Sequence, residues 1–198
     1  VLSIELGDDE AVVHLRYEYA GDNPGYPFAF AFSLSFYFRA NNHFDVSFGL
    51  HNFSNGAIPV GLGWHPYFTL GKPIEVVKMR LPEVERIEVD EFMIPTGETV
   101  PFEDFRELQP IGDAQFDTGF RIVEEGAKAE VVLHDGTNEL RYWQETGEGK
   151  FNFIQVYIPP ARTSIALEPM TCNIDAFNNK DGLLVLKPGQ GVMGRCGF

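Results

Sequence analysis

A histidine in the segment Val60–Phe68 is a candidate for proton transfer. Read with the two-residue period of a β-strand, this segment, VGLGWHPYF, has an apolar face and a nearly bare one. The apolar face holds Val60, Leu62, Trp64 and Phe68, and the other holds Gly61, Gly63, His65 and Tyr67. Because a proline favours an extended conformation for the residue before it, the alternation should continue through His65. An imidazole titrates near neutral pH, so His65 could serve as an acid or a base, although a lone histidine is more often structural.

A carboxylate and two polar side chains come from two later segments, residues 151–158 and 163–169. Gln155 and Tyr157 alternate with apolar residues in the first segment, and Glu168 follows small residues on one face of the second. The loop between the segments is short, so they should pair as a hairpin. We therefore expect Gln155, Tyr157 and Glu168 to lie on one surface. An exposed edge glutamate without a chemical role is the alternative for Glu168 considered by itself.

An aspartate, Asp117, is flanked by two phenylalanines in the segment Gln115–Phe120. It could cap a turn, or its fixed carboxylate could accept hydrogen bonds from sugar hydroxyl groups. No two histidines of the chain have the spacing of metal ligands, so no metal site is expected.

Period-two alternation along most of the chain predicts the strands that must position these side chains. The runs at residues 12–19, 34–39 and 44–50 alternate clearly, and two asparagines between the second and third runs predict a hairpin. Further strands are expected near residues 75–80, 84–89, 120–124, 129–134, 138–144, 151–158, 163–168 and 183–187. Helical spacing occurs only around Phe102, Phe105 and Leu108, and Pro95–Gly97 should form a turn. These patterns predict one all-β, sandwich-like domain over residues 1–198.

The 198 residues carry a formal net charge of −14, which limits the possible partners. Nucleic acids and anionic membranes repel an acidic surface, so neither is expected to bind, and a phosphorylated substrate is disfavoured for the same reason. Cys172 and Cys196 have no metal-ligand spacing and need no disulfide bond. No segment has the length of a membrane span or the pattern of a signal peptide. We therefore expect a cytoplasmic protein that is a monomer or a homodimer.

Four motifs, in their order along the chain, resemble those of the aldose 1-epimerases, also called galactose mutarotases. They are GWHPYF at Gly63–Phe68, IPTGE at Ile94–Glu98, FDTGF at Phe116–Phe120 and ALEPMT at Ala166–Thr171. The last motif continues to DAFN at Asp175–Asn178 and to LKPG at Leu186–Gly189. Each motif is weak by itself, whereas the ordered set is specific, and the resemblance extends from Tyr26 onward.

The resemblance implies a large antiparallel β-sandwich, the galactose mutarotase-like supersandwich. It also implies an enzyme that interconverts the α and β anomers of a free hexose such as glucose or galactose. By resemblance, His65 is the general acid at the ring oxygen and Glu168 is the general base at the anomeric hydroxyl. The expected contacts to the monosaccharide come from Asp117, Gln155, Tyr67 and Tyr157. Ring opening requires only that one proton be removed and another delivered, so no cofactor is expected.

One part of the family pattern has no counterpart in this sequence. The family has a second active-site histidine, in a His-Gly segment, and an arginine upstream of the matched region, but nothing before Tyr26 matches them. Because Val1–Gly7 already has the pattern of a later strand, we expect an N-terminally incomplete sandwich. Three other functions stay open. They are a non-catalytic carbohydrate-binding domain on the same fold, an epimerase of a modified sugar such as a hexose 6-phosphate, and a glycosidase using Asp117 and Glu168.

Overall fold

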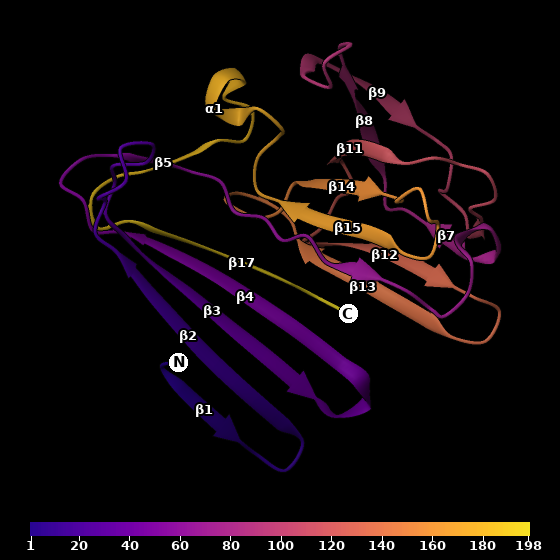
Figure 1. The fold of residues 1–198 in the computed structure, drawn as a ribbon, viewed down its shortest axis with the longest axis horizontal. Coiled ribbons are helices and arrows are strands. Elements are labelled where there is room, and N and C mark those ends of the chain that lie inside the picture. Colours follow the sequence, from indigo (N-terminus) through magenta and orange to yellow (C-terminus); the bar gives the residue numbers. More distant parts are fainter.

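Two antiparallel β-sheets account for most of the computed structural model, which describes residues 1–198 (Figure 1). They form because apolar and polar side chains alternate along the strands, which gives each sheet a face suited to burial. The apolar faces pack against each other. Phe48 and Tyr142 from the larger sheet share one buried cluster with Phe120 and Ile154 from the smaller sheet. This two-layer arrangement confirms the predicted antiparallel sandwich.

The larger sheet has nine strands, and each pairs with its neighbours in the antiparallel sense. In spatial order they are β1 (Ser3–Leu6), β2 (Glu10–Tyr19), β3 (Phe30–Arg39), β4 (His43–Asn52), β17 (Gly191–Gly197), β13 (Glu139–Glu145), β12 (Lys128–His134), β7 (Lys78–Arg80) and β10 (Gln109–Pro110).

The smaller sheet has six strands and carries the candidate functional residues. In spatial order they are β6 (Tyr67–Phe68), β15 (Ile165–Met170), β14 (Phe153–Tyr157), β11 (Asp117–Ile122), β8 (Val84–Val89) and β9 (Pro95–Phe102). Separately, β16 (Leu184–Leu186) pairs with β5 (Ile58–Val60). The helices are α1 (Ala176–Asn179) and two 3-10 turns at Ala40–Asn42 and Ile74–Val76. None of these helices is long and apolar enough to cross a membrane.

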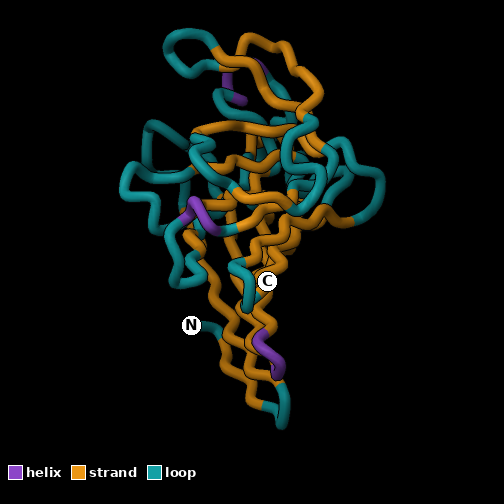
Figure 2. Tube along the Cα trace, turned by 90° about the vertical axis from the view of Figure 1, so that its right-hand side faces the viewer, coloured by secondary structure: helices purple, strands orange, loops and turns teal.

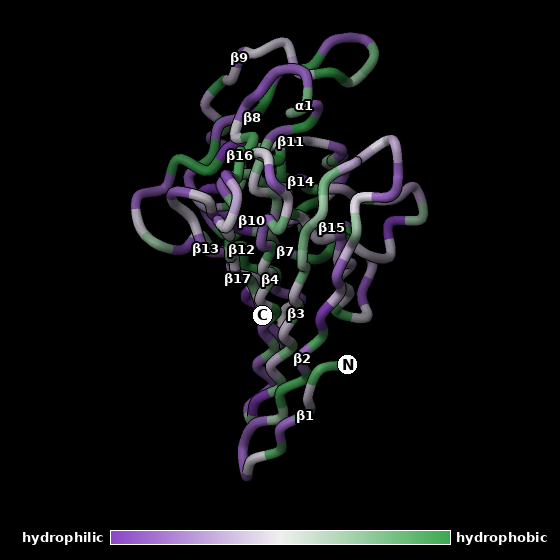
Figure 3. The backbone as a smooth tube through the Cα atoms, turned by 90° about the vertical axis from the view of Figure 1, so that its left-hand side faces the viewer, coloured by the Kyte–Doolittle hydropathy of each residue, from purple (hydrophilic) through white to green (hydrophobic).

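Strands β1 to β4 extend beyond the second layer as a long arm, while most loops gather around the two-layered part (Figures 1 and 2). The register places Phe32 opposite both Tyr17 and Leu50, so one face of the arm is apolar. Figure 3 shows the alternation of apolar and polar residues along these strands. At the far edge of the arm this apolar face is open to solvent, since Ile4 is 62% exposed and Leu6 is 81% exposed.

The hairpin predicted between residues 34–39 and 44–50 is confirmed by β3 and β4. Asn41 and Asn42 connect the strands in left-handed conformations, with φ of 63° and 62°, which asparagine tolerates better than most residues. The strand predicted at 84–89 coincides with β8, and that predicted at 129–134 begins one residue earlier, as β12. The hairpin predicted between residues 151–158 and 163–168 is also confirmed, by the pairing of β14 with β15.

Two local predictions are wrong. No helix forms around Phe102–Leu108, because Phe105 adopts a left-handed φ of 63° that buries its ring while Leu108 stays exposed. The apolar spacing there reflects separate core contacts and not a helical face. Pro95–Gly97 is not a turn but the start of β9, and the chain reverses instead at Asp90–Met93. The expected strand at 75–80 is shorter, because a 3-10 turn occupies its first residues.

The strand β17 was not predicted because glycines interrupt its alternation. Three of its seven residues are glycine, and glycine is normally unfavourable in a strand. At Gly194 the structure supplies a reason. A β-carbon there would stand 2.7 Å from Cε2 of Phe151, so the missing side chain makes room for a ring of the core.

Candidate active site

A cavity of about 410 Å³ opens over the smaller sheet, beside strands β15, β14 and β11. Its lining consists of His65, Asp117, Gln155, Tyr157, Glu168, Met170 and Ile174. The structure thus brings together all of the predicted site residues except Tyr67. That residue lies beside the cavity, where its ring stacks on the His65 ring with centroids 4.9 Å apart.

The residues of the site form a row across the sheet. Gln155 of β14 pairs with Glu168 of β15, and Gly119 of β11 pairs with Gln155. On the other side of β15, the pairs Tyr67–Ala166 and Gly63–Met170 have one register, which places His65 opposite Glu168. Paired residues of an antiparallel sheet project from the same face, so three strands and one connecting segment deliver their side chains to one cavity.

Two glycines allow the segment that carries His65 to approach β15. A β-carbon on Gly63 would stand 3.2 Å from the carbonyl oxygen of Pro169, and one on Gly61 would stand 2.6 Å from Sγ of Cys172. The close approach permits hydrogen bonds from the Trp64 amide to the Pro169 carbonyl and from the Thr171 amide to the Leu62 carbonyl. The bare face seen in the sequence therefore serves the packing of the backbone against β15.

His65 and Glu168 are in direct contact at the cavity. Nε2 of His65 lies 3.2 Å from Oε1 of Glu168, and the Glu168 side chain is 15% exposed, whereas that of His65 is 54% exposed. Burial raises the pKa of the Glu168 carboxyl above its ordinary value, the nearby charge of His65 lowers it, and the negative charge of Asp117 raises it further. The net effect is a raised pKa of Glu168, so the proton affinity of its carboxylate becomes closer to that of an imidazole.

A carboxamide and a carboxylate lie beside this pair. Nε2 of Gln155 donates a hydrogen bond to Oδ1 of Asp117 at 2.8 Å. Oε1 of Gln155 is buried and has no hydrogen-bond donor. A buried acceptor without a partner is unfavourable unless a ligand supplies the donor. The carboxylate of Asp117 can accept further hydrogen bonds, because Asp117 is exposed and only one of its oxygens receives the bond from Gln155.

Two residues of the cavity lining, Met170 and Ile174, were not predicted as site residues from the sequence. Met170 ends β15 and faces the cavity from the same strand as Glu168. Ile174 belongs to the segment that follows β15, and the only signal it gave was an apolar side chain within a polar stretch, Asn173–Asp175. These two side chains supply the apolar part of the lining.

The cavity lining has no permanently positive side chain and no cluster of metal ligands. None of the lining residues is lysine or arginine. No group of three or more histidine, cysteine, aspartate or glutamate side chains is placed to hold a metal ion.

A larger cavity of about 580 Å³ adjoins the candidate site at Met170, but its lining is mostly apolar and includes no pair of an acid and a base. The smaller cavity is therefore the candidate active site.

Comparison with known sequences identifies one matching family model, described as aldose 1-epimerase, which covers residues 2–197. YihR of Escherichia coli (strain K12), an uncharacterized protein, is 26% identical over 174 residues. This match covers 84% of the present chain and 54% of YihR. The chain therefore spans about half the length of this curated relative.

Several solved structures share the fold. A galactose mutarotase-like protein from Clostridium acetobutylicum superposes with a TM-score of 0.82 at 19% identity, covering 99% of this chain and 64% of that one. Galactose 1-epimerase from Lactobacillus acidophilus NCFM gives 0.74 at 17% identity, with 98% and 64% covered. A GalM/aldose epimerase homologue from C. elegans gives 0.77 at 14% identity, with 98% and 66% covered. At such identities the likeness establishes the fold alone.

Proposed function

The chain belongs to the aldose 1-epimerase family, and on that premise we propose that it interconverts the α and β anomers of a free hexose. Glucose and galactose are the substrates we propose. His65 would act as general acid at the ring oxygen, and Glu168 as general base at the anomeric hydroxyl.

The observation that carries this proposal is the 3.2 Å contact between His65 and Glu168. Opening a cyclic hemiacetal removes a proton from O1 and delivers one to O5, and both oxygens are bonded to the same carbon. The acid and the base must therefore reach neighbouring atoms of the substrate at the same time. Two proton-transferring groups already in contact, at the edge of an open cavity, satisfy this requirement.

The proposed reaction conserves protons and electrons. Glu168 takes the proton of the O1 hydroxyl while protonated His65 gives its proton to O5, and the C1–O5 bond breaks to leave an open-chain aldehyde. Rotation about the C1–C2 bond presents the other face of the aldehyde. The O5 hydroxyl then attacks C1, His65 recovers its proton from O5, and Glu168 returns its proton to O1. The product is the other anomer, and both side chains end as they began.

The electrostatics of the site favour transfer in both directions. An ordinary glutamate is a weaker base than imidazole, so a proton would stay on the imidazole most of the time. The raised pKa of Glu168 narrows this difference. Proton transfer is most effective when the proton affinities of the partners are similar, and a reversible epimerisation needs both directions.

Gln155 and Asp117 are proposed to hold the remaining hydroxyl groups of the sugar. The unpaired Oε1 of Gln155 can accept a hydrogen bond from one hydroxyl, and the Asp117 carboxylate can accept another. Tyr157 contributes a phenol to the same lining, and Tyr67 supports His65 through ring stacking. A hexose phosphate fits less well, because no lysine or arginine lines the cavity and the net charge is −14.

Polarimetry tests this function directly. Freshly dissolved α-D-galactose or α-D-glucose should approach equilibrium faster with the protein than in buffer, and the acceleration should depend on Glu168. Sugar binding measured by calorimetry, without acceleration, would instead indicate a non-catalytic carbohydrate-binding domain. Hydrolysis of an aryl glycoside without anomer exchange would indicate the glycosidase alternative.

A further inference from the structure

The segment between β15 and β16, residues 171–183, rises from the end of β15 beside the smaller sheet, and α1 is its only helix (Figure 1). Ile174 of this segment lines the candidate active site. Its Cδ1 lies 3.4 Å from the position that a β-carbon on Gly119 would occupy, so the isoleucine covers the central strand β11 beside Gln155. This apolar part of the cavity lining therefore belongs to a connecting segment and not to the sheet.

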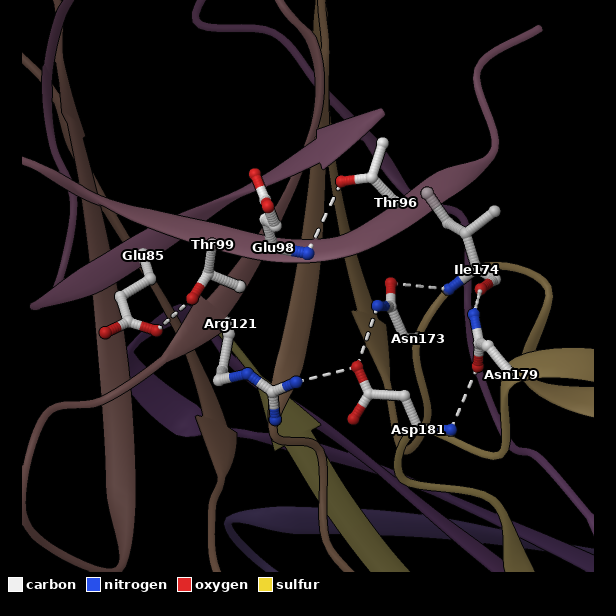
Figure 4. Close-up of polar contacts among 9 residues, drawn as sticks. All are labelled: Glu85, Thr96, Glu98, Thr99, Arg121, Asn173, Ile174, Asn179 and Asp181. Carbon is white, nitrogen blue, oxygen red and sulfur yellow. Dashed lines mark hydrogen bonds and ion pairs between the residues drawn. The ribbon is translucent and has the colours of Figure 1, made fainter. Parts of the chain in front are cut away.

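An ionic cluster fastens this segment to the sheet (Figure 4). Nη2 of Arg121, on β11, donates to Oδ2 of Asp181 at 2.6 Å, and Nδ2 of Asn173 donates to the same oxygen at 2.8 Å. Oδ1 of Asn173 accepts a hydrogen bond from the amide of Ile174 at 2.7 Å. One continuous chain of contacts thus runs from the sheet to the backbone of Ile174.

A second set of bonds holds the other side of Ile174. Nδ2 of Asn179 donates to the Ile174 carbonyl at 2.8 Å, and Oδ1 of Asn179 accepts from the amide of Asp181 at 2.9 Å. Both polar groups of the Ile174 backbone are therefore bonded to side chains that adjoin Asp181. The position of Ile174 depends on where Asp181 is held.

Few hydrogen bonds connect residues 171–183 to the rest of the protein. Thr171 bonds with Leu62 at the beginning of the segment, and Asp181 bonds with Arg121 near its end. All other hydrogen bonds of these residues are internal to the segment. The pair Arg121–Asp181 is therefore the one hydrogen-bonded contact between this segment and the strands β11 and β14 of the site.

The guanidinium of Arg121 is itself oriented by the sheet. It lies over the Phe153 ring, with 4.8 Å between Cζ and the ring centroid, and Phe153 pairs with Arg121 across β14 and β11. An arginine stacked on a buried ring presents its donors in a fixed direction. This contact makes Arg121 a rigid anchor for Asp181.

We propose that Arg121, Asp181 and Asn173 are positioning residues that hold Ile174 as an apolar wall of the sugar site. The proposal rests on the proposed function, because the wall would contact the C–H surface of the sugar while the polar groups on β11, β14 and β15 bind its hydroxyls. The wall contacts the substrate and its ring-opened form alike. Its loss should therefore weaken binding more than chemistry.

Two substitutions test the cluster. Arg121→Met removes the guanidinium and keeps a long side chain over Phe153, and Asp181→Asn keeps the shape and removes the charge. Each should raise KM for D-galactose roughly tenfold, the change that corresponds to about 1.4 kcal/mol. In both variants kcat and the pH profile should stay within about twofold of the unmodified protein. Arg141→Met is the matched control, since Arg141 pairs with Glu130 and Glu139 on the other sheet, and it should change neither constant.

A third variant keeps the proposal testable if the cluster is also needed for folding. Ile174→Ala leaves the ionic contacts in place and should reproduce the rise in KM. An unchanged KM in this variant, or a fall in kcat at unchanged KM in the cluster variants, would overturn the proposed wall.

Calorimetric titration with D-galactose separates this inference from the proposed function. If the unmodified protein binds the sugar without turning it over, the epimerase proposal fails, and weaker binding by Ile174→Ala would still support the wall. Equal affinities for the two proteins would refute the wall. An unmodified protein that neither binds nor turns over the sugar would refute both proposals.

Discussion

Gly63, which lies outside the named strands, forms an antiparallel bridge with Met170, the last residue of β15, and this bridge continues the register by which β6 pairs with β15. His65 lies two residues after Gly63, and Glu168 lies two residues before Met170. The contact between these two side chains is thus fixed by backbone pairing at both ends, at Gly63–Met170 and at Tyr67–Ala166. A site preorganised in this way needs no movement of the backbone to bring the two groups together.

Glu168→Gln should abolish most of the catalysis while keeping the shape of the site. The carboxamide cannot accept the proton of O1, so the rate constant for anomer exchange should fall by roughly 10²–10⁴, the usual contribution of a positioned base. Polarimetry gives the rate, and calorimetric titration with the sugar should show an affinity close to that of the unmodified protein. Normal turnover by this variant would remove Glu168 from the mechanism.

The activity should fall on the acid side at a pH above the ordinary range of a glutamate. The base must be ionised, and burial raises the pKa of Glu168 above its ordinary value of 4.5. The pH dependence of kcat/KM, which reports ionisation of the free protein, should therefore have its acidic midpoint above pH 4.5. A midpoint at or below that value would show that the buried carboxyl is not the group whose ionisation limits the rate.

The same raised pKa has a consequence for stability. Because the folded state binds the Glu168 proton more tightly than the unfolded state, the stabilising contribution is complete below the unfolded pKa and is lost as the pH rises through the folded pKa. Glu168→Gln does not titrate, so its free energy of unfolding should increase relative to the unmodified protein between about pH 4 and about pH 7. Urea unfolding at the two pH values measures this difference, and a constant difference would contradict the sign of the shift.

Trp64→Ala should lower the free energy of unfolding more than it lowers the rate of anomer exchange. Trp64 is half-buried and packs against Phe44 and Phe48, with ring centroids 6.2 Å and 6.5 Å away. We expect a loss of about 2–3 kcal/mol in the free energy of unfolding, somewhat less than for a fully buried tryptophan. Trp64→Phe should lose less, since it keeps an aromatic ring at the same place. Chemical denaturation followed by circular dichroism would measure both variants.

The polar half of the site was predictable because it follows from local pattern. Period-two alternation fixed the face of Gln155 and Glu168, and the short loop between their strands implied that those strands pair. His65 was harder to place, since its position depends on a bridge to Met170, far away in the sequence. Its residue type and its family motif indicated a role before its geometry could be derived.

The apolar wall and two of the strands were not predictable for physical reasons. Ile174 is held by side-chain contacts to Asp181 and Asn179, and no periodic pattern encodes such contacts. β17 has a glycine at position 194 because the Phe151 ring occupies the space that a side chain would need, which is a tertiary constraint. β9 begins with a Pro-Thr-Gly sequence that favours a turn locally, but its pairing with β8 prevails.

The glycine at position 63 provides the sharpest test of how the site is built. A β-carbon on Gly63 would stand 3.2 Å from the Pro169 carbonyl oxygen, which accepts the hydrogen bond from the Trp64 amide. Gly63→Ala should therefore push the segment away from β15 and separate His65 from Glu168. A misplacement of about 1 Å can reduce the rate of a positioned reaction by about 10²-fold. Because the contact requires a shift of a few tenths of an ångström, kcat should fall several-fold. Gly56→Ala is the matched control, because no atom lies within 4 Å of the added carbon. It should leave kcat unchanged. If Gly63→Ala lowered the melting temperature but kept full kcat, the bridge to Met170 would be a structural contact without influence on the acid–base pair.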